Sequence, residues 1–334
     1  MKIAFFDIQG WERPILKRGI KKHSLKFFHE PITLDNIKSI QQYDAVSVFI
    51  YSKINKEILQ KLPKLKLIIT RSTGFDHIDV KECKKRKILV YNIPSYGENT
   101  VAEHTFALIL ALSRKIHLSY LRTLRNDFSI EGLKGFDLKG KTLGVVGAGK
   151  IGKHVIRIAR GFEMNVLVYD HHEDEFLAEQ LGFKYVQLNK LLKDSDIVTL
   201  HVPYLKENHH FINKNTLKLM KKGAILINTS RGAIIDTGAL IDALDKKILA
   251  GAGLDVLEGE ELIKEEKQLL YDKKSISKLQ EIVKDHILLA KDNVVFTPHI
   301  AFYSQEALER IIEKTIQYIN DFSMKKIDKE CLIC

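Results

Sequence analysis

Cysteine is scarce in this sequence, and long apolar runs are missing from it. Its 334 residues include only 3 cysteines, Cys83, Cys331 and Cys334. They are too few for a disulfide framework, and their spacing is not that of a metal site. We therefore expect a reducing compartment, the cytoplasm. No apolar run approaches the ~20 residues that span a bilayer, so we expect no membrane contact.

Neither end of the sequence has the features of a targeting signal. The first residues, "MKIAFFDIQG", form a short apolar run broken by Asp7, which is typical of a buried strand and not of a signal peptide. The last four residues, "CLIC", have the form of a prenylation box. Cys is not usual as its last residue, however, and the basic cluster before it is small, so we do not expect lipidation.

Positive charge dominates, with a formal net charge of +11. A basic surface attracts phosphates, so nucleic-acid binding has to be considered. The lysines are scattered, as in "KKHSLK", "KECKKRK" and "LKLMKKG", without interleaved aromatic residues or a basic tail. This pattern favours a solvated lysine-rich surface that attracts small anions at most, and no nucleic-acid partner is expected.

Short apolar runs alternate with helix-like segments in the first hundred residues. The runs are "KIAFF", "LKFF", "AVSVFI", "LKLIIT" and "KILVYN". Continuous apolar runs separated by amphipathic segments predict a parallel sheet covered by helices on both faces. The sequence therefore predicts an α/β layer structure in this part of the chain.

A long apolar helix and a second alternation follow. Thr100 and Glu103 have capping-box spacing, which predicts a helix start at Thr100, and the helix is apolar enough to be buried between domains or subunits. A second sheet is predicted from "TLGVVG", "NVLVYD", "DIVTLHV", "AILINT", "GAGLDV", "NVVFT" and, more weakly, "KYV". Residues 262–290 are a charged, helix-like excursion, and Ser304 is predicted to begin a last amphipathic helix.

The second alternation contains a glycine turn between a strand and a helix, "GAGKIG" at 147–152. Gly147 permits the turn, Gly149 lets a pyrophosphate approach the backbone, and Gly152 lets the helix pack on the strand. The next strand ends in Asp170, which can accept hydrogen bonds from a ribose and would repel a 2′-phosphate. With no arginine directly after it, this pattern predicts a dinucleotide site that prefers NAD to NADP.

Later strands end in side chains that suit acid–base chemistry. Arg231 follows one strand, Asp255 begins an acidic loop with Glu258, Glu260 and Glu261, and His299 follows the last strand. Because ligands bind beyond the carboxyl ends of parallel strands, these side chains predict an active site. The pairs His171–His172 and His209–His210 lack the spacing of zinc ligands, so no metal site is expected.

On these residues the sequence resembles the D-isomer-specific 2-hydroxyacid dehydrogenases over essentially its whole length. The motifs are "GAGKIG" with Asp170, "HVP", "NTSRG", "GAGLDV" with "EGE", "TPH", "RSTGFDHID" and "VAEHT". Within the family, "NIPSYGENTVAEHT" and "PHIAFYS" resemble the D-lactate dehydrogenase branch. Relatives that act on glyoxylate, hydroxypyruvate, phosphoglycerate or formate usually have a small residue where Phe302 and Tyr303 stand.

The resemblance implies a two-domain α/β fold with the active site in the cleft between the domains. A smaller flavodoxin-like substrate domain would comprise residues 1–100, completed by 300–334. A Rossmann-type doubly wound parallel sheet, at residues 101–299, would bind NAD. Relatives dimerise through the apolar helix after Thr100, so we expect a homodimer.

The resemblance also assigns roles to individual residues. Arg231 would hold the carboxylate of a small 2-oxoacid or 2-hydroxyacid and polarise its carbonyl, and Glu260 would pair with His299. Further contacts to the substrate are implied for Thr73, Gly74, Tyr96 and Tyr303. Contacts to NAD are implied for Gly147, Gly149, Lys150, Ile151, Gly152, Asp170, Val202, Pro203, Asn208, Thr229, Ser230, Arg231 and Asp255.

The predicted reaction is the reversible, NADH-dependent reduction of pyruvate to D-lactate. His299, as imidazolium, would donate a proton to the carbonyl oxygen while Glu260 stabilises its charged form. Two alternatives remain open at this point: a reductase of a larger branched or aromatic 2-oxoacid, and a non-catalytic NAD-sensing corepressor. Neighbouring acids at 258 and 261 leave the choice of Glu260 to be tested.

Overall fold

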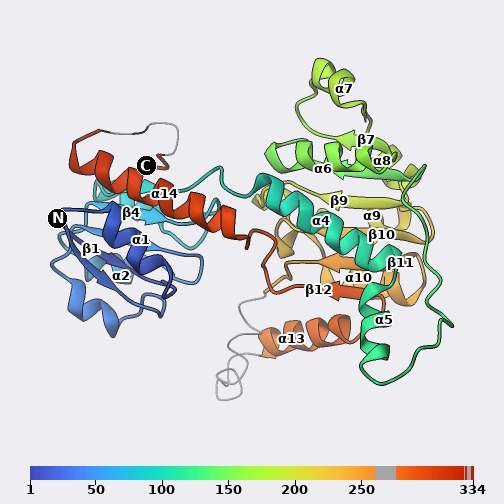
Figure 1. The fold of residues 1–334 in the computed structure, drawn as a ribbon, viewed down its shortest axis with the longest axis horizontal. Coiled ribbons are helices and arrows are strands. Elements are labelled where there is room, and N and C mark those ends of the chain that lie inside the picture. The colour runs from blue at the N-terminus through green and yellow to red at the C-terminus, as the bar shows by residue number, and fades with distance from the viewer. Residues whose placement is uncertain (260–275, 327, 329–331) are drawn as a thin grey trace. The chain divides into compact units, whose positions relative to one another are not determined.

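The computed structural model describes residues 1–259, 276–326, 328 and 332–334. The chain divides into two compact units (Figure 1). The first unit comprises Met1–Gly97 together with Ser304–Cys334, and the second comprises Glu98–Tyr303. Each unit contains one parallel sheet. No helix in the described residues combines the length and the apolar character that a membrane crossing requires.

The first unit has a five-stranded sheet in the order β2-β1-β3-β4-β5, and all four strand pairings are parallel. Its strands are β1 (Lys2–Phe5), β2 (Ser24–Phe27), β3 (Ala45–Val48), β4 (Leu67–Thr70) and β5 (Leu89–Tyr91). The connecting segments include α1 (Glu12–Gly19), η1 (Asn36–Ile40), α2 (Lys56–Gln60) and α3 (Val80–Lys85). All five predicted strands are confirmed, and the strand order is that of flavodoxin-like sheets.

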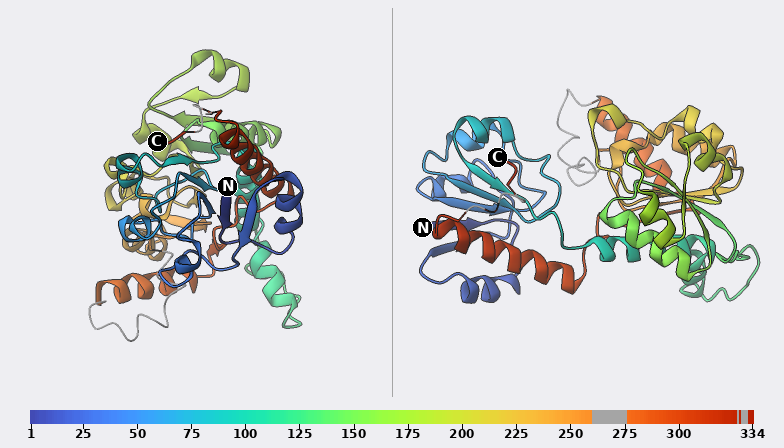
Figure 2. Two further views of the ribbon diagram at one scale, coloured as in Figure 1. Left: turned by 90° about the vertical axis from the view of Figure 1, so that its left-hand side faces the viewer. Right: turned by 90° about the horizontal axis from the view of Figure 1, so that it is seen from above.

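The central strands of the first sheet are apolar throughout because both faces are covered. Every residue of β3 and β4 is buried. Helix α14 (Gln305–Ser323) lies beside α1, as Figure 1 and Figure 2 show, and a Cβ on Gly19 would come within 2.6 Å of Cδ1 of Ile316. Helix α14 begins where predicted, since the Ser304 hydroxyl accepts the Ala307 N–H at 3.2 Å.

Residues 332–334 pair with β5 at the edge of the first sheet. Leu332 forms an antiparallel bridge with Tyr91, and the Ile333 N–H donates to the carbonyl of Val90 at 2.8 Å. Cys334 lies near the buried Cys83, and burial raises the pKa of the Cys83 thiol to about 12. Cys83 is therefore an unreactive core residue, and the described part of the "CLIC" sequence has a structural role.

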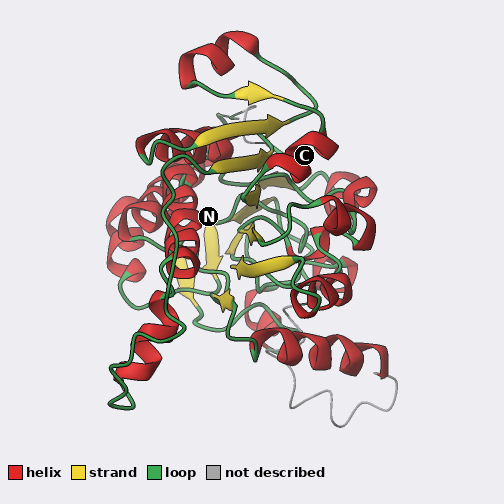
Figure 3. Cartoon of the chain, turned by 90° about the vertical axis from the view of Figure 1, so that its right-hand side faces the viewer, coloured by secondary structure: helices red, strands yellow, loops and turns green. Residues whose placement is uncertain are grey.

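The second unit has a seven-stranded parallel sheet in the order β12-β11-β10-β9-β6-β7-β8, with helices on both faces (Figure 3). Its strands are β6 (Thr142–Val146), β7 (Asn165–Tyr169), β8 (Lys184–Tyr185), β9 (Ile197–Leu200), β10 (Ala224–Asn228), β11 (Leu249–Leu254) and β12 (Val294–Phe296). All seven predicted strands are confirmed, including the weak "KYV". The order β9-β6-β7 places a topological switch at β6, where dinucleotides bind in such sheets.

Ten helices of the second unit are described. They are α4 (Glu98–Ser113), α5 (Ile116–Thr123), α6 (Lys150–Gly161), α7 (Glu175–Leu181), α8 (Leu188–Asp194), α9 (Lys214–Leu219), α10 (Thr237–Asp245), α13 (Ile276–Leu289) and the short η2 (Lys206–Asn208) and η3 (Gly232–Ile234). Helix α13 confirms the helical character of the later part of the 262–290 excursion. The earlier part, through residue 275, lies outside the described residues.

The predicted start of α4 was wrong. The helix begins at Glu98, so Thr100 lies in its first turn and is buried instead of capping it. The Ser/Thr-x-x-Glu spacing was therefore coincidental. The helix is buried, but within its own unit, where Phe106, Leu108 and Ile109 belong to a core formed with β6, β10 and α6. Its burial between domains or subunits stays a prediction.

Candidate active site

The carboxyl ends of six adjacent parallel strands meet at one edge of the second sheet. This edge carries the glycine turn after β6, Asp170 after β7, the 201–203 segment after β9, Arg231 after β10, Asp255 after β11 and His299 after β12. The sheet order therefore brings together the strand ends that the sequence singled out. These strand ends converge because the strands are parallel, although they are separated along the chain.

The three glycines of the turn have different surroundings. Gly147 has φ +96°, and a Cβ there would lie 2.6 Å from the carbonyl oxygen of His201. A Cβ on Gly152 would lie 2.1 Å from the carbonyl oxygen of Gly147, so only glycine lets α6 pack this closely. Gly149, the N-cap of α6, has nothing within 4 Å of its Cβ position. The helix N-terminus is thus open to a pyrophosphate, as the fingerprint requires.

Asp170 is fixed against this turn by the backbone. Its Oδ2 accepts the Ala148 N–H at 2.7 Å, and its Oδ1 accepts the His172 N–H at 3.0 Å. Each carboxylate oxygen can accept a further hydrogen bond, so the side chain is positioned and still able to bind ribose hydroxyls. Lys150, the first residue of α6, is exposed, and Ile151 packs at the edge of the core.

The loop after β9 is held by its own side chains. Asn208 accepts the Leu205 N–H at 2.8 Å and donates to the carbonyl of Pro203 at 2.7 Å. Both of its polar atoms therefore fix the loop that carries Val202 and Pro203. The His201 ring is enclosed although part of the residue reaches the surface, and burial lowers its pKa to about 3. His201 is consequently a neutral imidazole beside the glycine turn.

The segment after β10 leads to Arg231 through a compact turn. Oδ1 of Asn228 accepts both the N–H and the hydroxyl of Ser230, and its side-chain amide donates to the carbonyl of Arg231 at 2.9 Å. The buried Thr229 lies 3.0 Å from the hydroxyl of Thr105 on α4. This turn fixes the backbone from which the Arg231 guanidinium extends.

Asp255 is almost fully buried at this edge, with 1% of its surface exposed. It accepts the Thr297 hydroxyl at 2.5 Å and the backbone N–H groups of Ile300 and Ala301, both at 2.9 Å. Nε2 of His104 lies 2.8 Å from the Thr297 oxygen and 3.5 Å from Oδ1 of Asp255. Burial lowers the pKa of His104, and the nearby Asp255 carboxylate opposes that shift.

These contacts hold His299 in an uncommon backbone conformation. His299 has φ +55°, in the left-handed region, and its N–H donates to the carbonyl of Asp255 at 2.9 Å. Such a conformation costs a non-glycine residue roughly 1–3 kcal/mol and occurs preferentially at functional sites. The Phe302 ring stands edge-on to the imidazole, with centroids 6.5 Å apart and planes at 81°. Asp255 thus holds the loop on both sides of His299.

Sequence reasoning did not assign a role to His104 or Thr297. Both lie within motifs that were singled out, "VAEHT" and "TPH", but His104 is separated from Asp255 by most of the second unit's sequence. Glu260, the predicted partner of His299, lies outside the described residues, as does Glu261. Tyr303 is described and is exposed.

In the first unit, the predicted substrate contacts follow β4 and β5. The Thr73 hydroxyl donates to the carbonyl of Ile93 at 3.0 Å, and the Asn92 side-chain amide donates to the carbonyl of Thr73 at 2.7 Å. The Ser72 hydroxyl donates to the carbonyl of Gly74 at 2.7 Å. These hydrogen bonds use the Thr73 hydroxyl and the carbonyls of Thr73 and Gly74, and they fix the backbone at these two residues.

Arg310 of α14 fixes the second predicted substrate segment of this unit. Its Nη1 donates to the carbonyl of Tyr96 at 2.6 Å. The last helix thereby ties down the segment that follows β5, and it does so through the backbone, which leaves the assigned role of the Tyr96 side chain untested.

The combination of a glycine turn, a placed acid and strand-end Arg and His defines the class as an NAD-dependent dehydrogenase. The sequence model described as "D-isomer specific 2-hydroxyacid dehydrogenase, NAD binding domain" matches residues 106–301. The solved D-lactate dehydrogenase from Aquifex aeolicus, complexed with NAD and lactic acid, is 40% identical, with a TM-score of 0.88 and coverage of 99% of this chain and 98% of that one.

Curated relatives have several substrates. D-lactate dehydrogenase from Escherichia coli is 36% identical over 328 residues, which is 96% of each chain. Glyoxylate reductase from Thermococcus litoralis is 38% identical over 331 residues, which is 97% of this chain and 89% of that one. The chain therefore belongs to the D-isomer-specific 2-hydroxyacid dehydrogenases and is an NAD-dependent enzyme of that family.

Proposed function

We propose that this enzyme reduces pyruvate to D-lactate with NADH, reversibly. The observation that carries the proposal is the environment of His299. Its loop is locked by Asp255, and the edge-on Phe302 ring takes up space beside the imidazole. A bulky aromatic ring next to the proton donor favours a substrate whose carbonyl carries a small substituent, and the methyl group of pyruvate is such a substituent.

Each strand-end group has a part in the proposed reaction. Bound NADH supplies a hydride to the carbonyl carbon. His299 donates the proton that the carbonyl oxygen acquires, and Glu260 is proposed to hydrogen-bond its other ring nitrogen. Arg231 binds the carboxylate, because its planar guanidinium can form paired hydrogen bonds. The backbone at Thr73 and Gly74, together with Tyr96, is proposed to bind the substrate as well.

The strongest competing proposal is a larger 2-oxoacid, branched or aromatic. A screen of kcat/KM for pyruvate, glyoxylate, hydroxypyruvate, 2-oxoisocaproate and phenylpyruvate, each with NADH and with NADPH, tests it directly. We expect pyruvate with NADH to give the highest value. A higher value for 2-oxoisocaproate or phenylpyruvate would replace pyruvate as the substrate, and no turnover with any 2-oxoacid would support an NAD-sensing role instead.

Exposed apolar side chains on α5 and the following loop support the expected homodimer. Six of them are between 49% and 86% exposed: Ile116, Tyr120, Leu121, Leu124, Phe128 and Ile130. So many large apolar side chains on one continuous segment indicate a protein interface. We propose that a second copy of this chain covers them.

Light scattering should give a dimer for the wild type and a monomer for the double variant Phe128→Asp/Ile130→Asp, whereas the control Phe176→Asp, on exposed α7, should remain dimeric.

A further inference from the structure

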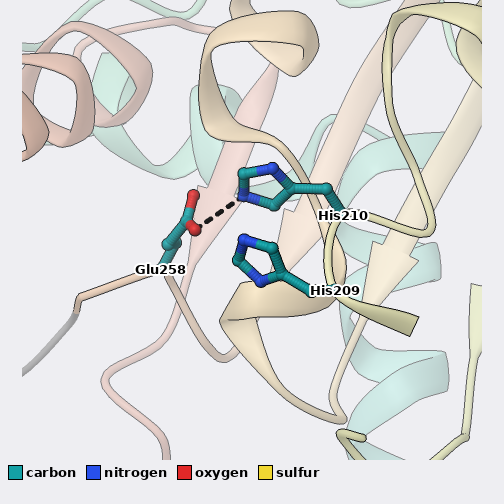
Figure 4. A group of neighbouring side chains, drawn as sticks. All are labelled: His209, His210 and Glu258. Carbon is teal, nitrogen blue, oxygen red and sulfur yellow. Dashed lines mark hydrogen bonds and ion pairs between the residues drawn. The ribbon is translucent and has the colours of Figure 1, made fainter. Parts of the chain in front are cut away.

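Two adjacent histidines and a glutamate that is far from them in the sequence form a cluster near the end of β11 (Figure 4). Each of His209, His210 and Glu258 offers one ligand atom, and these atoms all lie within 4.8 Å of one another. Spacing along the sequence indicated no metal site at His209–His210. The folded chain supplies a third ligand that the spacing could not reveal.

The backbone of the histidine loop brings both rings to one place. Consecutive side chains on an extended segment point in opposite directions. His210 departs from that pattern because it adopts a left-handed conformation, with φ +51°. The two imidazole rings consequently stack, with centroids 3.8 Å apart and planes at 23°.

Both loops of the cluster rest on the same short turn, η3. The His210 N–H donates to the carbonyl of Ala233 at 3.0 Å. On the other side, Gly232 contacts the second loop so closely that a Cβ there would lie 2.0 Å from the carbonyl carbon of Leu257. Since Leu257 directly precedes Glu258, the same turn positions the backbone at His210 and next to Glu258. A site that is organised before binding loses little entropy when an ion arrives.

The ligand set is selective in its chemistry. Two imidazole nitrogens and one carboxylate oxygen suit zinc and related borderline ions, whereas calcium and magnesium prefer oxygen alone. Bonds of ~2.0–2.2 Å in tetrahedral geometry separate the ligand atoms by roughly 3.3–3.5 Å. Nε2 of His210 is now 2.6 Å from Oε1 of Glu258, where the imidazole N–H can donate to the carboxylate. Metal binding would replace this hydrogen bond, because the two atoms are now closer than two ligands of one ion.

We propose that His209, His210 and Glu258 bind one divalent transition-metal ion, of which Zn²⁺ is the representative. Solvent is the natural source of the fourth ligand, because His209 is exposed. The ion would join the loop that follows β9 to the loop that follows β11. The rival explanation is a simple His210–Glu258 ion pair, in which His209 has no role.

Metal titration of the untagged, chelator-treated protein distinguishes the two explanations. We would follow Co²⁺ by its visible absorption and Zn²⁺ by calorimetry. The variants are His209→Phe, which keeps a stacked ring, and Glu258→Gln, which keeps a hydrogen-bonding group without the charge. The control is His172→Phe, which removes an exposed histidine outside the cluster. Circular dichroism would confirm that each variant is folded.

We expect one equivalent of metal to bind to the wild type and to the control. Metal affinity should fall in both cluster variants by more than the ~10–100-fold that results from losing a residue that only supports a metal ligand. Equal affinity in His209→Phe and the wild type would overturn the proposal, and so would a failure to observe stoichiometric binding. Neither readout depends on enzyme activity, so the result is independent of the substrate proposed above.

Discussion

Both sheets are parallel, but the residues that follow the carboxyl ends of their strands have different roles. At the edge of the first sheet, the buried Arg71 guanidinium donates to the carbonyls of Phe6 and Asp7, at 2.8 and 2.9 Å, and lies 3.9 Å from Oε1 of Glu12. Burial lowers the pKa of Arg71, while Glu12 and Asp7 oppose that shift. At the edge of the second sheet, the N-terminus of α6 at Gly149 is open.

The difference separates two uses of polar groups. In the first unit Arg71 joins the ends of β4 and β1, and Asp7 accepts the Phe49 N–H after β3 at 3.1 Å. These polar groups are therefore used for internal hydrogen bonds. In the second unit glycine leaves the N-terminus of α6 uncovered, and backbone groups hold the Asp170 carboxylate and the Arg231 guanidinium. Changes at Arg71 or Glu12 should therefore lower the stability of the fold, whereas changes at the second edge should lower activity or cofactor binding.

The largest expected effect is at His299. His299→Gln removes the proposed proton donor but keeps a polar side chain of similar size, so kcat for pyruvate should fall by about 10²–10⁴-fold. NADH binding, measured by fluorescence, should persist. Retention of a tenth or more of wild-type activity would exclude His299 as the proton donor.

Arg71 should give the largest effect on stability. Arg71→Met leaves Glu12 buried without its cation, and breaking a buried pair in this way costs about 3–5 kcal/mol. Urea unfolding followed by circular dichroism measures the loss. The control Arg18→Met, at an exposed position on α1, should change the free energy of unfolding little. Similar losses in the two variants would show that the buried network is unimportant.

Arg231 tests geometry at constant charge. Arg231→Lys keeps the cation and loses the planar pair of donors, so kcat/KM for pyruvate should fall by roughly 100-fold while NADH affinity changes little. The comparison requires steady-state kinetics and NADH titration on the same preparation. A lysine variant with near-normal kcat/KM would place Arg231 away from the substrate carboxylate.

His201 should make stability depend on pH within the second unit. Its pKa is lowered from 6.5 to about 3 in the folded chain. Between these values the unfolded chain binds a proton that the folded chain does not, so the free energy of unfolding falls as pH drops below 6.5. The stabilisation that neutral His201 contributes is fully present above pH 6.5. By pH 4.5 the free energy of unfolding should have decreased by on the order of 2 kcal/mol.

The variant His201→Gln isolates this dependence. Its stability should decline less steeply than that of the wild type between pH 6.5 and 4.5, in urea titrations at several pH values. His172→Gln, at an exposed position, should follow the wild type. Identical slopes for His201→Gln and the wild type would mean that His201 is protonated in the folded chain.

The smallest predicted change is in cofactor preference. Asp170→Asn keeps an acceptor for the Ala148 N–H and removes the charge that would repel a 2′-phosphate. The ratio of kcat/KM with NADH to that with NADPH should fall about tenfold, as expected for loss of a charged hydrogen-bond acceptor. An unchanged ratio would assign the preference to other residues.

Local patterns in the sequence predicted the strands, and the residues that follow them, well. The strands, the glycine turn and the Ser304 cap depend on neighbouring residues, and parallel pairing then brings their ends together. Contacts between distant residues were not predictable. Nothing in the periodicity links Glu12 to Arg71 or His104 to Asp255, because burial of a polar pair depends on packing that only the folded chain defines.

The error at Thr100 has the same origin. Thr100 matched a capping pattern, but the core of the second unit accommodates it inside α4. The proposed metal site likewise depends on Glu258, which another loop brings next to His209 and His210. Spacing along the sequence could not show either tertiary contact.

The division of the first unit between two chain segments has a consequence for its synthesis. Helix α14 covers Gly19, and residues 332–334 pair with β5, yet both follow the whole second unit in the sequence. At about 5–20 residues per second, roughly 10–40 s separate the emergence of Gly97 from that of Ser304. During that time the surface around Gly19 and the β5 edge lack their native partners. The first unit is therefore completed only after the second has been synthesised, and until then its five-stranded sheet has to avoid aggregation without helix α14 and the edge partner of β5.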